Sequence, residues 1–172
     1  MDFAMTYTSE QEEFRDDVRR WLADNLPQGA VGEPEDEATA RKQYLARREL
    51  GRRMSKQGWL YAAAPKEYGG GGLDLPRITV LSEELREYGL SNPPYYDSGG
   101  WLGSSTILVW GTDEQKQRLL PPIFTGEVRT WQLLTEPESG SDLASVKLSA
   151  RRDGDDYVLN GSKVFVGSVR CV

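Results

Sequence analysis

The sequence predicts an α+β fold in which an N-terminal all-α domain is followed by the beginning of an antiparallel β-domain. Two observations support this class. Up to about residue 122, apolar residues recur with helical spacing in segments that capping residues, Pro and Gly separate. From residue 129 onward, short apolar runs alternate with Xaa-Gly turns, which is typical of antiparallel strands. We therefore expect an α-helical domain over residues 1–124 and a partial β-domain over residues 125–172.

The first helix is predicted over residues 9–26. Ser9 and Glu12 have the spacing of a capping box, and Pro27 follows the helix directly. One apolar face comprises Phe14, Val18, Trp21 and Leu22.

A second helix should follow the acidic loop 33–37 and reach about Gln57, because acidic residues favour the first turn of a helix. Its buried stripe is predicted to be Ala46, Leu50 and Met54. A basic ridge on another face comprises Arg48, Arg52 and Lys56. Such a ridge can bind nucleic acid, but a solvated face is the common arrangement opposite an apolar stripe, and we expect that here.

Three further helices are predicted after the glycine-rich segment 65–72. No Gly-Lys-Ser/Thr follows these glycines, so a tight connection is expected rather than a P-loop. The next helix starts at Leu75-Pro76, ends near Gly89 and buries Ile78, Leu81, Leu85 and Tyr88. The apolar run 106–110 predicts a buried helix that ends at Gly111. Thr112 and Gln115 then form the capping box of a last helix with Leu119 and Leu120 directed inward.

The β part is predicted to be a meander of short strands. The apolar runs are 131–134, 146–151, 157–159 and 164–166, with turns at Asp153-Gly154 and Asn160-Gly161. Because the sequence ends among these strands, we expect unpaired edges and an incompletely covered face.

Composition excludes several classes of function. A formal charge of −6 argues against nucleic-acid binding, which usually needs a basic field. With no histidine and one cysteine, the chain cannot build a His-based triad, an internal disulfide or the commonest zinc sites, and we expect no metal site. The N-terminus has no signal-peptide pattern and no run of apolar residues is long enough to span a membrane, so we expect a cytoplasmic protein without a membrane span.

The turn over residues 135–142 has the composition of a ligand-binding loop. It combines hydroxyl groups with Gly140, where a backbone can approach a ligand closely, and consecutive N–H groups can bind an anion. Glu136, Glu138 and Asp142 oppose an anion by charge, so a diphosphate here would need backbone donors and a cation from elsewhere. Gly, Ser and Pro are also ordinary turn residues, so a polar loop remains an alternative.

The complete motif set resembles the acyl-CoA dehydrogenase family. In the β part the motifs are Trp131-Gln132-Leu133-Leu134-Thr135-Glu136-Pro137, Gly140-Ser141-Asp142 and Asn160-Gly161-Ser162-Lys163. In the helical part they are Pro65-Lys66-Glu67-Tyr68-Gly69-Gly70, Trp110-Gly111-Thr112, Gln115-Lys116-Gln117, Leu120-Pro121-Pro122 and Thr125-Gly126-Glu127. The resemblance spans nearly the whole chain, with the landmarks in the family's order.

The resemblance implies a cofactor, FAD, held between the β-domain and a C-terminal four-helix domain, in dimers or tetramers. The cofactor-binding residues that it implies are Gln132, Leu134, Thr135, Gly140, Ser141, Phe165, Val166 and Gly167. Leu134 and Thr135 would lie at the isoalloxazine ring, Gly140 and Ser141 near the diphosphate, and Ser141 would also bind the acyl-CoA substrate. Phe165 stands where the family has Trp, and Gly167 replaces a Thr, which removes a hydroxyl near the flavin.

The implied reaction is oxidation of an acyl-CoA thioester to the trans-2-enoyl-CoA, with electrons passed to an electron-transfer flavoprotein. The family's catalytic base is a glutamate of the C-terminal domain, so no catalytic residue is assigned in this chain. We expect the chain to be an N-terminal portion of the enzyme, or a truncated subunit that assembles with other acyl-CoA dehydrogenase subunits. The alternatives are a non-catalytic interaction partner of a full-length paralogue, and an acyl-CoA oxidase or flavin monooxygenase of the same fold.

Overall fold

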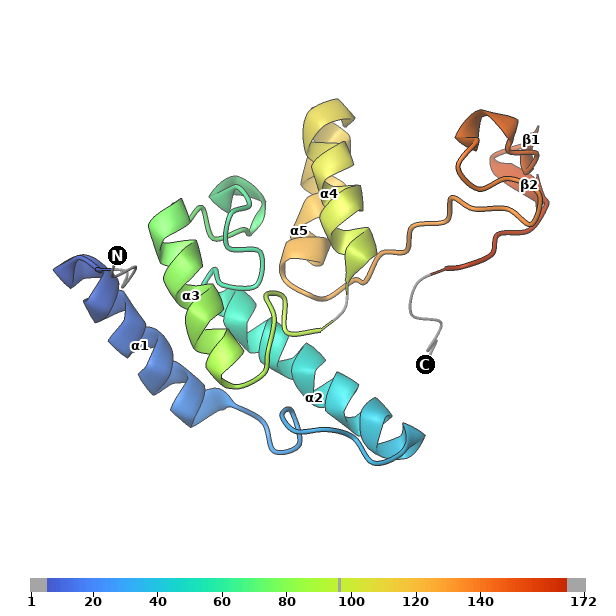
Figure 1. The fold of residues 1–172 in the computed structure, drawn as a ribbon. Coiled ribbons are helices and arrows are strands. Elements are labelled where there is room, and N and C mark those ends of the chain that lie inside the picture. Colours follow the sequence, from blue (N-terminus) through green and yellow to red (C-terminus); the bar gives the residue numbers. More distant parts are fainter. Residues whose placement is uncertain (1–5, 96, 167–172) are drawn as a thin grey trace, which may run out of the picture.

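The structure, a computed structural model, describes residues 6–95 and 97–166. Five α-helices precede a single β-hairpin in the described part of the chain, which agrees with the predicted α+β class (Figure 1). The helices are α1 (Ser9–Asn25), α2 (Glu37–Lys56), α3 (Leu75–Glu87), α4 (Ser98–Trp110) and α5 (Asp113–Phe124). Two 3-10 turns, η1 (Lys66–Tyr68) and η2 (Leu143–Ser145), lie in the connections.

The helical part has one apolar core. Leu22 from α1, Leu50 from α2, Leu85 from α3 and Phe124 from α5 are all nearly inaccessible to solvent. Burial of apolar surface is the main stabilising contribution to such a core. None of the helices in the described ranges combines the length and apolarity that a bilayer crossing requires.

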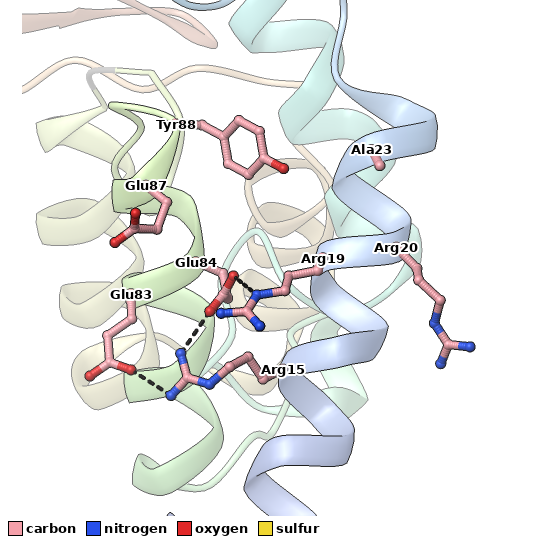
Figure 2. Close-up of a pocket in the computed structure, with 8 residues that line it drawn as sticks. All are labelled: Arg15, Arg19, Arg20, Ala23, Glu83, Glu84, Glu87 and Tyr88. Atoms are coloured by element: carbon pink, nitrogen blue, oxygen red, sulfur yellow. Dashed lines mark hydrogen bonds and ion pairs between the residues drawn. The ribbon is translucent and has the colours of Figure 1, made fainter. Parts of the chain in front are cut away.

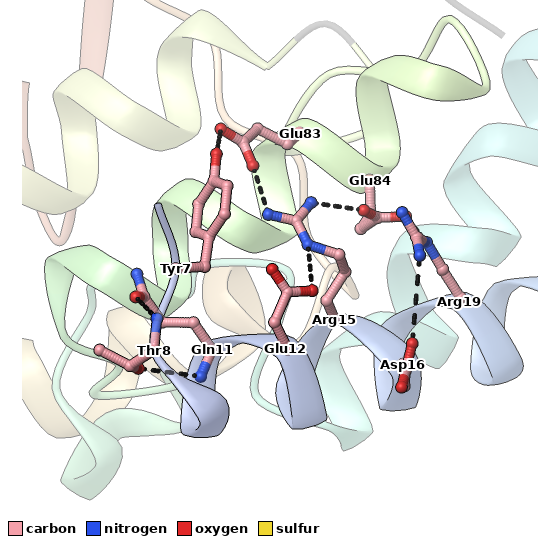
Figure 3. Close-up of polar contacts among 9 residues, drawn as sticks. All are labelled: Tyr7, Thr8, Gln11, Glu12, Arg15, Asp16, Arg19, Glu83 and Glu84. Atoms are coloured by element: carbon pink, nitrogen blue, oxygen red, sulfur yellow. Dashed lines mark hydrogen bonds and ion pairs between the residues drawn. The ribbon is translucent and has the colours of Figure 1, made fainter. Parts of the chain in front are cut away.

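Helix α1 is held on α3 by a network of charged residues (Figure 3). Arg15 donates to Glu84 at 2.6 Å and to Glu83 at 2.9 Å, and Arg19 donates to Glu84 at 2.8 Å. The side chains of Arg15 and Glu84 are only 9% and 3% exposed. Burial opposes the charge on Arg15, but its bonds to Glu84 and Glu83 outweigh burial and raise its pKa.

The glycine-rich segment is a tight connection, as expected. Gly71 donates to the Tyr61 carbonyl at 3.1 Å, and the following Gly72 donates to the Ala64 carbonyl at 2.8 Å. A Cβ added to Gly71 would lie 1.9 Å from the carbonyl oxygen of Gly58. Glycine is therefore required at Gly71 because two backbone segments touch there.

Several details of the predicted helices are wrong. The capping box of α1 is formed by Thr8 and Gln11, one residue earlier than predicted. Helix α4 is not buried at its end, where Val109 is 67% and Trp110 83% exposed, and Leu119 of α5 is 37% exposed.

The basic ridge of α2 is only partly solvated. Arg48 and Arg52 both donate to the carbonyl of Gly126, at 3.2 and 3.3 Å. These bonds tie α2 to the chain that follows α5, so two residues of the ridge have a structural role.

The predicted meander is reduced to one hairpin in the described residues. Strand β1 (Ser149–Asp153) pairs antiparallel with β2 (Asp156–Asn160), from Ser149 opposite Asn160 to Asp153 opposite Asp156. Residues 131–134 and 164–166 belong to no strand, and Phe165 has a left-handed backbone with a φ of 53°. Both of these segments lack a full set of neighbouring strands within the described chain, and a strand exists only by pairing.

Candidate functional site

The two segments that the sequence assigns to a flavin lie side by side. Val164 donates its N–H to the carbonyl of Thr135 at 2.9 Å. The Lys163 ammonium donates to the carbonyl of Leu134, also at 2.9 Å. These bonds place Leu134 and Thr135 next to the chain that carries Phe165.

The side chains around this contact are largely open to solvent. Leu133 is 52%, Leu134 45% and Phe165 92% exposed, and Gln132 is exposed as well. Thr135 and Val166 are half-buried, whereas Gly167 lies outside the described residues. Leu133, Leu134 and Phe165 are therefore apolar side chains that the described chain covers only in part.

The Glu136 carboxylate connects the two segments of the site through hydrogen bonds. Its carboxylate is 7% exposed and accepts bonds from the N–H of Lys147 at 2.6 Å, the N–H of Leu148 at 2.8 Å and the ammonium of Lys163 at 2.9 Å. The Lys147 N–H, Lys163 and the Leu148 N–H, in that order, lower the pKa of Glu136 to about 2. Glu136 is thus held ionised as part of the scaffold.

This role of Glu136 was not predicted from the sequence. There, Glu136 counted only as a negative charge opposing a bound anion, and Lys163 only as part of a motif. One signal was present: carboxylates, Glu136 among them, follow Thr135, and the cation Lys163 precedes Phe165, so groups of opposite charge lie next to residues assigned to the same ligand.

The turn after Glu136 is closed by its own hydrogen bonds. Glu136 and Ser139 exchange backbone bonds of 2.9 and 3.1 Å. The Ser139 hydroxyl donates to the carbonyl of Asp142 at 2.6 Å and accepts from Ser145 at 2.8 Å. The Ser139 hydroxyl is therefore already used within the turn, whereas Gly140 and Ser141, which follow it, are exposed.

The site fits an anionic flavin nucleotide better than its sequence suggests. Of the three carboxylates near the turn, Glu136 is paired with Lys163 and Glu138 with Lys147. Gly140 does not have a left-handed backbone, and a Cβ built on it meets no described atom within 4 Å. The chain itself therefore does not require glycine at 140, whereas the close approach of a ligand would.

Two hollows on the helical part are lined by residues outside the candidate flavin site. A groove of about 680 Å³ between α1 and α3 is lined by Arg15, Arg19, Arg20, Ala23, Glu83, Glu84, Glu87 and Tyr88 (Figure 2). Its central side chains are paired with one another across the two helices, so we interpret it as part of the structural network.

A smaller hollow of about 190 Å³ lies beside α4. Its lining includes Tyr61, Trp101, Ser104, Leu108 and Phe124. Tyr61 donates its hydroxyl to the buried Asp97 at 2.7 Å, and burial together with Asp97 raises the pKa of Tyr61. Tyr61 therefore stays protonated, and its one O–H is already donated to Asp97.

Comparison with known proteins identifies the family. Residues 8–127 match the model of the acyl-CoA dehydrogenase N-terminal domain. The chain belongs to the acyl-CoA dehydrogenase family. It is 33% identical over 169 residues to acyl-CoA dehydrogenase FadE26 of Mycobacterium tuberculosis, covering 96% of this chain and 41% of that one. The chain thus spans about two fifths of the length of this relative.

Solved structures share the fold of this chain. The ChsE4-ChsE5 complex from Mycobacterium tuberculosis matches with a TM-score of 0.67 and 33% identity, over 95% of this chain and 40% of that one. An acyl-CoA dehydrogenase from Bacillus anthracis, solved in complex with FAD, matches with a TM-score of 0.60 and 26% identity, over 93% of this chain and 27% of that one.

Proposed function

We propose that this chain supplies the helical domain and the first part of the β-domain of an FAD-dependent acyl-CoA dehydrogenase. The reaction would convert an acyl-CoA thioester to the trans-2-enoyl-CoA and pass the electrons to an electron-transfer flavoprotein. One observation carries the proposal: Val164 bonds to Thr135, so that the two flavin-assigned segments form one surface. The division into domains over 1–124 and 125–172 and the cytoplasmic location remain predictions.

The residues proposed to hold FAD have distinct tasks. The exposed apolar side chains of Leu134 and Phe165, with Gln132, Thr135 and Val166, would cover the ring and keep water from it. Gly140 and Ser141 would approach the diphosphate, and Ser141 would also contact the acyl-CoA. Gly167 belongs to the same proposed set. When bound, FAD would supply the hydride acceptor, a role that no side chain can fill.

Assembly with a further acyl-CoA dehydrogenase chain is part of the proposal. One of the matching structures is a complex of two differently named chains, ChsE4 and ChsE5, and this likeness supports a hetero-oligomer. The same observation supports the second candidate, a non-catalytic subunit that completes a paralogue.

The test is to isolate the chain from its native cells under non-denaturing conditions and record the flavin absorbance of the fraction that contains it. Flavin that an acyl-CoA bleaches, and that an electron-transfer flavoprotein then reoxidises, is the expected result. Rapid reoxidation by oxygen would favour an acyl-CoA oxidase instead. A fraction without flavin that contains a paralogue would favour the non-catalytic subunit.

A further inference from the structure

We propose that Arg129 is a positioning residue that sets the course of the flavin-binding segment by bridging it to helix α2. The inference rests on the proposed function, since it concerns how residues 132–135 are presented to FAD. Arg129 is not among the residues that the family resemblance assigns to the cofactor. Its guanidinium instead contacts two aromatic rings, Tyr44 of α2 and Trp131 at the start of the flavin-binding segment.

The geometry is that of a cation held by two rings. The guanidinium carbon of Arg129 lies 5.1 Å from the centroid of the Tyr44 ring and 4.3 Å from that of Trp131. A terminal nitrogen of Arg129 also donates to the Tyr44 hydroxyl at 2.6 Å. Cations at these distances are attracted to the face of an aromatic ring, most strongly to Trp.

Tyr44 is a firm support because it is attached to the core. It belongs to α2 and packs edge to face on Tyr95, with the ring centroids 6.4 Å apart. Tyr95 is 4% exposed and belongs to the core cluster. Arg129 therefore connects Trp131, through Tyr44, to the helical core.

Other groups do not compete for the Arg129 guanidinium in the described ranges. None of the ion pairs formed among those residues involves Arg129, and its Nε, although buried, has no hydrogen-bond partner among them. The rings and the Tyr44 hydroxyl are the contacts that hold it. The residue after Arg129, Thr130, lies close to α4. A Cβ added to Gly99 of that helix would lie 2.1 Å from the carbonyl oxygen of Thr130.

The flavin-binding segment is consequently held at both ends. Arg129 and Thr130 fix its start on the helices, and Glu136 fixes its end on Lys163. Near that end, Leu134 and Thr135 also accept bonds from Lys163 and Val164. Loss of the first anchor would therefore loosen the part of the segment that precedes these bonds, from Trp131 to Leu133.

The experiment reads the mobility of this segment without relying on FAD. A nitroxide is attached at Leu133→Cys in a Cys171→Ser background. A separate variant, labelled at Leu75→Cys on α3 in the same background, serves as a reference, since both positions are exposed. We expect Arg129→Gln to shorten the correlation time of the label at 133 roughly threefold, towards free loop motion, and to leave the label at 75 unchanged.

Conservative variants separate the proposal from general destabilisation. Arg129→Lys keeps a cation over the rings and should restore most of the slow motion, and Arg118→Gln removes an exposed arginine of α5 as the matched control. An unchanged spectrum at 133 in Arg129→Gln, or equal loosening at both labels, would overturn the role of Arg129. Absence of FAD from the wild-type protein would overturn the proposed function alone, because the labels decide the role of Arg129 independently.

Discussion

Glu136 and Lys163 lie 27 positions apart in the sequence, yet their side chains form an ion pair of 2.9 Å with exposed fractions of 7% and 15%. The pair joins the two motif halves that define the candidate flavin site. It also makes that site dependent on pH in a defined direction.

The first prediction concerns acid. The folded state lowers the pKa of Glu136 to about 2, below the ordinary value of 4.5. A depressed carboxyl pKa contributes stability that is complete above about pH 4.5 and is lost as the pH falls towards 2. Loosening of residues 134–136 and 163–164, followed by NMR shifts across that range, is the expected outcome. In Lys163→Met the transition should move to higher pH, and an unmoved midpoint would contradict the role of the pair.

The second prediction concerns the buried network of α1 and α3. Glu84→Gln leaves the buried Arg15 without its principal counter-charge, and this should lower the free energy of unfolding by about 3 kcal/mol. Denaturation in urea measures the change. Arg20→Gln, which breaks the exposed contact between Arg20 and Asp17, is the control and should cost less than about 0.5 kcal/mol. Equal effects of the two variants would show that burial of the network is unimportant.

The third prediction distinguishes two adjacent hydroxyl residues. Thr8 caps α1, accepting from the N–H of Gln11, whereas Ser9 is the first residue inside the helix. Thr8→Ala should cost about 1 kcal/mol and Ser9→Ala much less. Helix content and thermal unfolding followed by circular dichroism provide the comparison, and the reverse order would restore the capping box predicted from the sequence.

The fourth prediction separates two kinds of glycine. Gly71→Ala forces a methyl group onto the carbonyl of Gly58 and should destabilise the fold by about 2 kcal/mol. Gly140→Ala meets open space, so its unfolding temperature should match the wild type while its affinity for FAD falls several-fold. Isothermal titration with FAD and a thermal melt of each variant decide the matter. Undiminished FAD binding by Gly140→Ala would remove Gly140 from the proposed site.

The fifth prediction tests the helical core. Leu50 is fully buried in the core cluster, so Leu50→Ala should cost about 3 kcal/mol through the cavity it leaves. Leu75 is 74% exposed, and Leu75→Ala should change stability by less than about 0.5 kcal/mol. Urea denaturation of both variants checks the placement of the core.

The helices were predictable because their signals are local. Thr112 and Gln115 form the predicted capping box, and the helix starting at Leu75-Pro76 is present. The start of α4 was not predictable in this way, since its first turns contain Gly99, Gly100 and Gly103, which have low helix propensity. The exposure of Trp110 could not be predicted either, because an apolar residue does not by itself show which face of its helix packs on the core.

The assignment of Thr135 and Phe165 to a flavin stays a prediction from the motifs, and the motifs did not predict what holds their segments together. The bonds that join the two segments involve the backbone of Val164 and the side chain of Lys163. Such pairings depend on the path of the chain between the motifs, which composition and spacing do not determine. For the same reason, the ring contacts of Arg129 could not be inferred from its position.

The hairpin β1–β2 buries none of its residues, since every position in both strands is exposed. A pair of strands without a buried face is marginal in water. We therefore expect the hairpin to open while the helical core stays folded. Denaturant curves followed by helical circular dichroism would then report the helical core, and the hairpin would need probes of its own.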